Sequence, residues 1–269
     1  MAGPPSLRIA SNDGTFIAIF SSGHGPPLVL VHGTTADHTT FRVIGPHLER
    51  HFTIHAVDRR GRGASGDGLA YSIEREFEDL VAVARTLADA SGEPVPFFGH
   101  SYGGRCALGA ALLSDAIERV ICYEGAPVPP GRTYHPPGLE ERLRELADAG
   151  DPAGVLATFM TGIVGMTPAE LAAFQADPVW PVRVAAAGTI LRELEAEASA
   201  AAALERLRTV HQPVLQLLGS ASLPIFRDAT VALDARLADG RIVEIAGAKH
   251  AAHHTHPDLV VNAVRAFLA

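Results

Sequence analysis

Lysine is almost absent from this sequence, and cysteine and tryptophan are scarce. The 269 residues include one lysine, Lys249, two cysteines and one tryptophan, so arginine supplies nearly all of the positive charge. Thirty acidic side chains against 22 basic ones give a formal net charge of -8. Because phosphate contacts need clustered basic side chains, we expect no nucleic-acid-binding face. The arginines are spread along the chain, which favours solvated faces over a binding stripe.

The two cysteines and the lack of long apolar runs bear on the compartment. Cys106 and Cys122 fall in apolar segments, and two thiols in a chain this long are typical of buried, reduced side chains. No stretch approaches the roughly 20 apolar residues that cross a bilayer, and the first residues lack a basic region followed by an apolar run. We expect a cytoplasmic protein with no disulfide and no membrane partner.

Eight short apolar or alternating segments are interspersed with helical patterns, which predicts an α/β fold: a mostly parallel sheet with helices on both faces. The first two strands flank a turn at 12–14 and predict an antiparallel hairpin. The predicted strands cover 7–10, 16–21, 28–31, 52–57, 95–98, 119–123, 214–218 and 241–245. The predicted helices cover 39–50, 72–90, 102–113, 224–238 and 257–268.

Residues 127–208 contain no strand pattern. They carry amphipathic or alanine-rich helical patterns that are interrupted by prolines. With 47% hydrophobic residues, the chain has enough apolar material for one buried core. We therefore predict a core made of 1–126 and 209–269, and a helical cap made of 127–208.

The segment Gly99-His100-Ser101-Tyr102-Gly103 has the pattern G-x-S-x-G between a predicted strand and a predicted helix. In this setting the serine occupies a tight, strained turn, and the small neighbours leave room for it. Ser101 is thus the candidate nucleophile. The alternative is an ordinary helix-capping serine.

A serine hydroxyl needs a base, and for a nucleophile on such a turn the chain order is Ser, acid, His. His250 lies in the loop between the last strand and the last helix, from which it can reach back over the carboxyl edge of the sheet. His253, His254 and His256 follow it, but no set of cysteines or carboxylates accompanies them to complete a metal shell. We predict His250 as the base and no metal or other cofactor.

An oxyanion that develops during acyl transfer needs two backbone N–H donors. One comes from the residue after the nucleophile, Tyr102, and the other from the loop after the strand at 28–31, where Thr34 follows His32-Gly33. The alternative for Gly33 and Thr34 is an ordinary turn between a strand and a helix.

Taken together, these motifs resemble the α/β-hydrolase family over nearly the whole chain apart from the variable cap. The matching segments are His32-Gly33, 58–65, 99–104, Gly247-Ala248-Lys249-His250 and His256-Pro257-Asp258. The resemblance implies an α/β-hydrolase fold with an eight-stranded sheet. A serine at position 101 is similar to the esterases, thioesterases and cofactor-free haloperoxidases of the family, whereas its epoxide hydrolases and dehalogenases have aspartate there.

The acid departs from the common family pattern. Many members carry an aspartate just after the strand corresponding to 214–218, but here residues 219–224 contain no carboxylate. Some relatives place the acid after the preceding strand, where this chain has Glu124. The resemblance therefore makes Glu124 the candidate that orients His250. The alternative is a loop or substrate-contacting carboxylate beside a serine–histidine dyad. Asp228 and Asp258 are explained as helix-surface and helix-start residues.

The sequence favours hydrolysis of a carboxylic ester or thioester of a small, largely apolar molecule through an acyl-enzyme. The alternatives are a non-hydrolytic cyclase, lyase or haloperoxidase-like enzyme on the same scaffold, or a catalytically silent small-molecule binder. Apolar cap residues either line the substrate pocket or form the core of the cap. The candidate pocket residues are Thr35, Phe159, Met160, Trp180 and Leu223, and Met166 and Phe174 have the same character.

Overall fold

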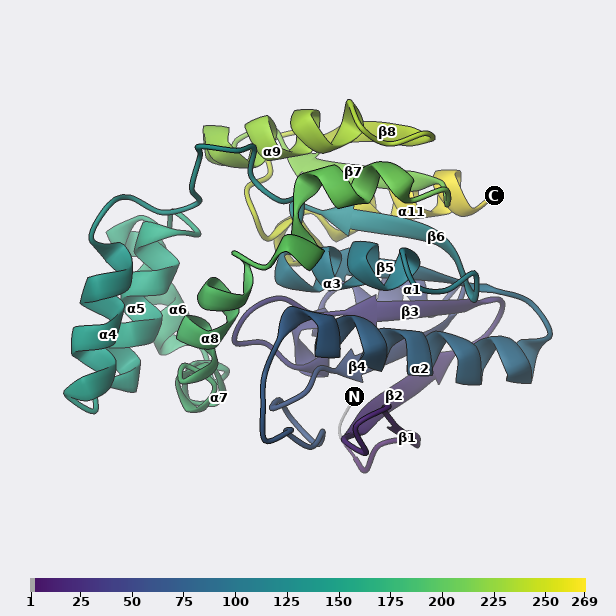
Figure 1. Cartoon of the computed structure of the whole chain (residues 1–269), viewed down its shortest axis with the longest axis horizontal. Coiled ribbons are helices and arrows are strands. Elements are labelled where there is room, and N and C mark those ends of the chain that lie inside the picture. The colour runs from purple at the N-terminus through teal and green to yellow at the C-terminus, as the bar shows by residue number, and fades with distance from the viewer. Residues whose placement is uncertain (1–2) are drawn as a thin grey trace.

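The computed structural model describes residues 3–269, apart from the side chain of Ala202. Eight strands form one sheet in the order β1-β2-β4-β3-β5-β6-β7-β8 (Figure 1). The strands are β1 (Leu7–Ala10), β2 (Phe16–Gly23), β3 (Pro27–Val31), β4 (Thr53–Asp58), β5 (Val95–His100), β6 (Ile117–Tyr123), β7 (Val214–Gly219) and β8 (Gly240–Ile245). β2 pairs antiparallel with β1 and β4, and every other pair is parallel. The predicted sheet and its antiparallel edge are confirmed.

Alternate residues of the central strands pack on opposite faces of the sheet. In β3, Val29 and Val31 join the apolar cluster beneath α2 (Ile73–Ser91), α3 (Tyr102–Ala111) and α9 (Pro224–Asp234). Leu28 and Leu30 join the cluster beneath α1 (Gly45–Leu48) and α11 (Pro257–Leu268). Because helices cover both faces, β3 is apolar at every position, which explains its continuous apolar run.

The predicted helix over 39–50 is wrong. The chain forms a 3-10 helix, η1 (His38–Arg42), and then the single turn α1. Pro46 explains the break, because it has no N–H and its ring would clash with the carbonyl group of Arg42 in a continuous helix. A further short helix, α10 (Ala252–Thr255), lies in the segment before α11 that had no predicted structure.

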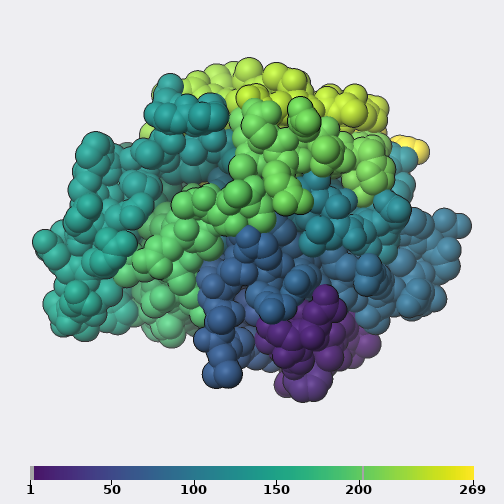
Figure 2. All heavy atoms as spheres, in the orientation of Figure 1, coloured from purple at the N-terminus to yellow at the C-terminus, as the bar shows by residue number. Residues whose placement is uncertain are grey.

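Between β6 and β7 the chain forms α4 (Leu139–Asp148), α5 (Pro152–Gly162), α6 (Pro168–Ala176), α7 (Trp180–Ala185), α8 (Thr189–Ala196), η2 (Ala200–Ala202) and η3 (Leu204–Thr209). Helices α4–α8, here called the helical insertion, form one end of the molecule (Figures 1 and 2). They have an apolar core of their own, which includes Leu143, Leu156 and Ile190. Lys249 of the core forms an ion pair with Glu170 of α6 at 2.7 Å.

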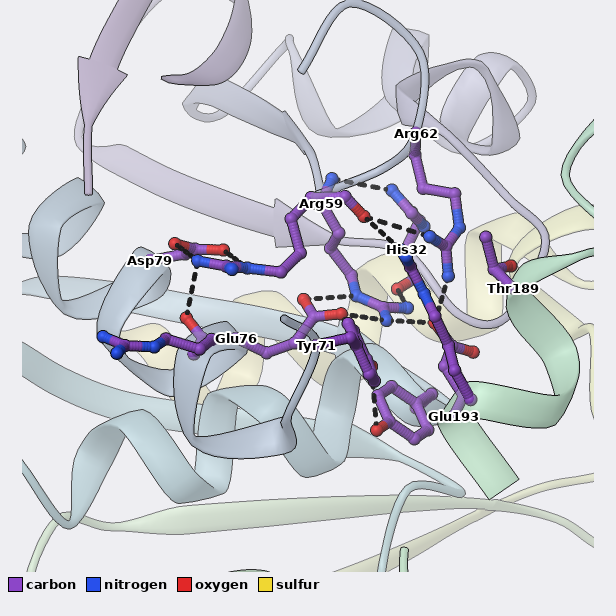
Figure 3. A network of polar contacts seen from close by, with 12 residues as sticks. His32, Arg59, Arg62, Tyr71, Glu76, Asp79, Thr189 and Glu193 are labelled. Atoms are coloured by element: carbon purple, nitrogen blue, oxygen red, sulfur yellow. Dashed lines mark hydrogen bonds and ion pairs between the residues drawn. The ribbon is translucent and has the colours of Figure 1, made fainter. Parts of the chain in front are cut away.

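The expectation that the arginines lie on solvated faces is wrong for a group of them. Arg59, Arg60, Arg62, Arg105 and Arg183 are buried. Arg59 pairs with Glu76 of α2 at 2.7 Å and also with Glu193 of α8, which Arg62 contacts as well (Figure 3). This buried network joins the loop after β4, helix α2 and the helical insertion.

Two further expectations from the sequence concern the cysteines and membrane-spanning segments. Cys106 and Cys122 are buried and free, as predicted. None of the described helices is both long and apolar enough to cross a membrane.

Candidate active site

Ser101 occupies a strained turn between β5 and α3. Its backbone has φ 53° and ψ −127°, in a region that residues with a side chain rarely adopt. A Cβ on Gly99 would lie 2.5 Å from the carbonyl oxygen of Gly103, and a Cβ on Gly103 would lie 2.4 Å from the carbonyl oxygens of Val31 and His32. Both glycines of the G-x-S-x-G pattern therefore permit close backbone approach around the serine.

Backbone strain is concentrated at the carboxyl edge of the sheet. Among the described residues, the non-glycine residues with positive φ are Thr35, Ser101 and Glu124, with values of 59°, 53° and 47°. They follow β3, β5 and β6, which are neighbours in the sheet. Strained residues of this kind persist where the surrounding structure holds them, and they are enriched at functional sites.

Glu124 and His250 form a buried hydrogen-bonded pair. Nδ1 of His250 donates to Oε2 of Glu124 at 2.6 Å. Oε1 of Glu124 accepts hydrogen bonds from the N–H of Gly219 at 2.7 Å and from the hydroxyl of Ser222 at 2.5 Å. A carboxylate that accepts at Nδ1 keeps the proton there, so Nε2 of the neutral imidazole is a proton acceptor. The ring of Phe226 stacks on His250, with centroids 4.5 Å apart.

The loop that carries His250 is held by side chains from the strand ends. Nε2 of His100 donates to the carbonyl oxygen of His250 at 2.8 Å. The Tyr123 hydroxyl donates to the carbonyl oxygen of Lys249 and accepts from the N–H of Ala252 at 2.9 Å. β5 and β6 thus fix the backbone on both sides of the imidazole.

Thr34 and Tyr102 lie beside Ser101. Tyr102 is the first residue of α3, so its N–H is one of the helix donors that lack a carbonyl partner within the helix. Both residues line a cavity that also contains Ser101. A Cβ on Gly33 would lie 3.0 Å from Cβ of Ser101, so this glycine lets the loop after β3 approach Ser101 closely.

Two cavities in the described structure reach Ser101 and His250. The smaller has a volume of about 40 Å³ and the larger about 340 Å³. Phe159 lines both, and Met160 lines the larger, as do Met166 and Phe174. The larger cavity can hold a small organic molecule.

Three of the candidate pocket residues lie outside the lining of both cavities in the part of the chain that the structure describes. Thr35 is buried on its strained turn. The Trp180 ring packs edge-on against Phe174, with centroids 5.3 Å apart, and it belongs to the core of the helical insertion. Leu223 packs beside Gly165 and is partly exposed.

Several residues that line the two cavities were not predicted from the sequence. Arg105, Tyr134, Glu197 and Phe226 line the smaller cavity, and Arg183 lines the larger one. Arg183 carried a signal, because it stands alone among the apolar residues of 179–187. Phe226 carried none, since an aromatic residue in an amphipathic helix is typical of core packing.

Burial keeps three histidines near the site, His100, His253 and His254, in the neutral form. Burial lowers the pKa values of His100 and His253 well below the usual range, and it lowers that of His254 to about 4. Among the described residues, Asp37, His38 and Asp58 form the one group close enough to share a metal ion. Asp58 already accepts hydrogen bonds from His38 and Ala64, which gives this group a structural role.

Comparison with known proteins identifies the family to which this chain belongs. The sequence model of the Alpha/beta hydrolase family matches residues 28–263. A 2-(acetamidomethylene)succinate hydrolase from Mesorhizobium japonicum is 27% identical over an alignment of 258 residues, and the match covers 91% of this chain and 89% of that protein. An N-formylmaleamate deformylase from Pseudomonas putida is 32% identical over 120 residues, 44% of each chain.

A crystal structure shows the same relationship. An alpha/beta hydrolase from Sphaerobacter thermophilus has 31% sequence identity and a TM-score of 0.82, and the match covers 98% of this chain and 100% of that one. The family match spans most of the chain, and the eight-stranded sheet agrees with it. The chain is therefore an enzyme of the α/β-hydrolase family.

Proposed function

We propose that this protein hydrolyses a carboxylic ester or thioester of a small molecule through an acyl-enzyme. Ser101 attacks the carbonyl carbon while Nε2 of His250 accepts its proton, and Glu124 stabilises the imidazolium ion that forms. The N–H groups of Thr34 and Tyr102 bind the oxyanion. His250 then protonates the leaving group, and a water molecule activated by the same imidazole releases the acyl group.

The hydrogen bond between His250 and Glu124 carries this proposal. A buried carboxylate at 2.6 Å from Nδ1 fixes the tautomer that a general base requires. Two further donors hold the same carboxylate in place. This arrangement supports a triad over a serine–histidine dyad. Two relatives are named as a 2-(acetamidomethylene)succinate hydrolase and an N-formylmaleamate deformylase. Amides are therefore also worth testing as substrates.

The helical insertion acts in this proposal as a cap that shapes the pocket. Residues 127–208 form the cap, and 1–126 with 209–269 form the catalytic core. The support is that Phe159, Met160 and Val164 of the insertion line the same cavity as Ser101 and His250. Apolar residues there favour a largely apolar acyl group.

Labelling with a fluorophosphonate tests the activated serine. We expect the wild-type protein to be labelled at Ser101, with the adduct located by mass spectrometry, and we expect Ser101→Ala to remain unlabelled. A folded wild-type protein that resists the reagent would contradict the proposal and favour a silent binder. A labelled enzyme that converts ester and thioester panels to products other than the free acid would instead support the cyclase, lyase or haloperoxidase-like alternatives.

A further inference from the structure

The larger cavity contains a buried cation with no ionic partner. Arg183 projects from α7 of the helical insertion, is 8% exposed and lines this cavity together with Ser101. In the part of the chain that the structure describes, its guanidinium group forms no ion pair, and its hydrogen bond is with Thr40 Oγ1 at 3.0 Å. The remaining N–H donors of this group have no described partner.

The other arginines that line the two cavities differ from Arg183. Arg42 pairs with Asp177 at 3.2 Å, and Arg105 pairs with Glu197 at 3.4 Å. Asp37, the other acidic group near Arg183, is engaged in capping η1 through the N–H and hydroxyl of Thr39. Moving a charge out of water costs free energy unless a counter-charge accompanies it. Arg183 has no such counter-charge of its own among the described residues.

The charge of Arg183 persists at neutral pH. Burial lowers the pKa of Arg183 to about 10, which leaves the guanidinium group protonated at pH 7. The imidazole rings of His253 and His254 line the same cavity and are neutral there, because burial lowers their pKa values. No positive charge from these rings competes for an anion.

A second buried polar group in the cavity lacks a partner. Neither ring nitrogen of His253 has a hydrogen-bond partner in the described structure, although the residue is only 1% exposed. A neutral imidazole offers one donor and one acceptor. The larger cavity therefore presents an unpaired guanidinium group and an unsatisfied imidazole on walls that are otherwise largely apolar.

We propose that Arg183 binds a carboxylate of the substrate, so that the molecule cleaved at Ser101 is a small acid carrying a free carboxylate beside its ester or thioester bond. A carboxylate accepts two parallel hydrogen bonds from one guanidinium group, which matches the unused donors of Arg183. The inference deepens the proposed function and rests on it for the bond that is cleaved. Carboxylate binding at Arg183 itself is measurable without turnover.

The first experiment measures binding in Ser101→Ala by isothermal titration calorimetry with succinate, glutarate and adipate. We expect at least one dicarboxylate to bind, and Arg183→Met in the same background to weaken its Kd about tenfold to a hundredfold, because a charge-assisted hydrogen-bonded pair is lost. Arg192→Met is the matched control. Arg192 is an ion-paired arginine on α8 that lines neither cavity at Ser101, and its replacement should leave the Kd within twofold.

The second experiment compares monomethyl glutarate with methyl pentanoate, which differ by a carboxylate in place of a methyl group. We expect Arg183→Met to lower kcat/KM for the charged ester about tenfold to a hundredfold and to leave the neutral ester within threefold. Arg183→Lys should recover part of the loss.

These outcomes separate the two proposals. If no dicarboxylate binds, or if Arg183→Met binds it as tightly as its parent, the carboxylate assignment is overturned even when fluorophosphonate labels Ser101. Equal losses on both esters overturn it as well. If Ser101 resists labelling while binding depends on Arg183, the proposed hydrolysis fails and the carboxylate site stands.

Discussion

Replacement of Glu124 by glutamine is expected to lower kcat about 10⁴-fold with the fold intact. Glu124 accepts three hydrogen bonds, from His250, Gly219 and Ser222. An amide has only one oxygen. Because the backbone N–H of Gly219 can only donate, the amide oxygen faces that side and the NH₂ group faces His250. The imidazole must then accept at Nδ1 and carry its proton on Nε2, where it cannot take the proton of Ser101.

Steady-state kinetics on the best ester found in the panel, with circular dichroism to check folding, measures this effect. Glu197→Gln is the matched control, because Glu197 also lines the smaller cavity but pairs with Arg105 instead of a histidine. Its replacement should change kcat less than about tenfold. A Glu124→Gln enzyme with kcat within threefold of wild type would rule out the triad and leave the serine–histidine dyad.

Replacement of Glu193 by alanine is expected to lower the free energy of unfolding by about 3–5 kcal/mol. The Glu193 side chain is 1% exposed and contacts both Arg59 and Arg62 (Figure 3). Without it, Arg59 keeps only Glu76 as an ion-pair partner among the described residues, and Arg62 keeps none. The partly exposed pair between Arg192 and Asp67 is then the ion pair left between α8 and the loop after β4. The penalty arises from the charges left behind, which cannot regain their hydration.

Urea unfolding at pH 7 measures this loss against Glu195→Ala on the same helix. The side chain of Glu195 is 60% exposed and pairs with Arg144 at 3.4 Å, so its removal should change the free energy of unfolding by less than about 1 kcal/mol. Equal losses for the two variants would show that the buried network does not hold the insertion to the core.

Most of the core was predictable because its signals are local. The continuous apolar run of β3 reflects burial on both faces, and serine is a favoured capping residue at a helix start, where the side chain of Ser72 accepts from the N–H of Arg75. The break at Pro46 carried a local signal too, because a proline inside a helical pattern ends or kinks the helix. The turn α10 carried no periodic pattern and depends on tertiary contacts such as the hydrogen bond from Ala252 to Tyr123.

The site was predictable only where a motif defines it. Ser101 and His250 stand in short patterns, and Glu124 followed from the family resemblance once residues 219–224 offered no carboxylate. The groups that hold Glu124, by contrast, are a backbone N–H and a serine hydroxyl about 95 positions away. The Arg59–Glu193 network joins residues 134 positions apart, and composition cannot show which arginines become buried.

The single lysine makes the protein suited to site-directed chemistry without mutagenesis. The side chain of Lys249 is half exposed, its amine pairs with Glu170 of α6, and the next residue is His250. An amine-reactive dye or resin therefore has one ε-amino target, apart from the α-amino group of the chain, and that target lies between the core and the helical insertion. A fluorophore attached there would report movement of the insertion relative to the loop of His250.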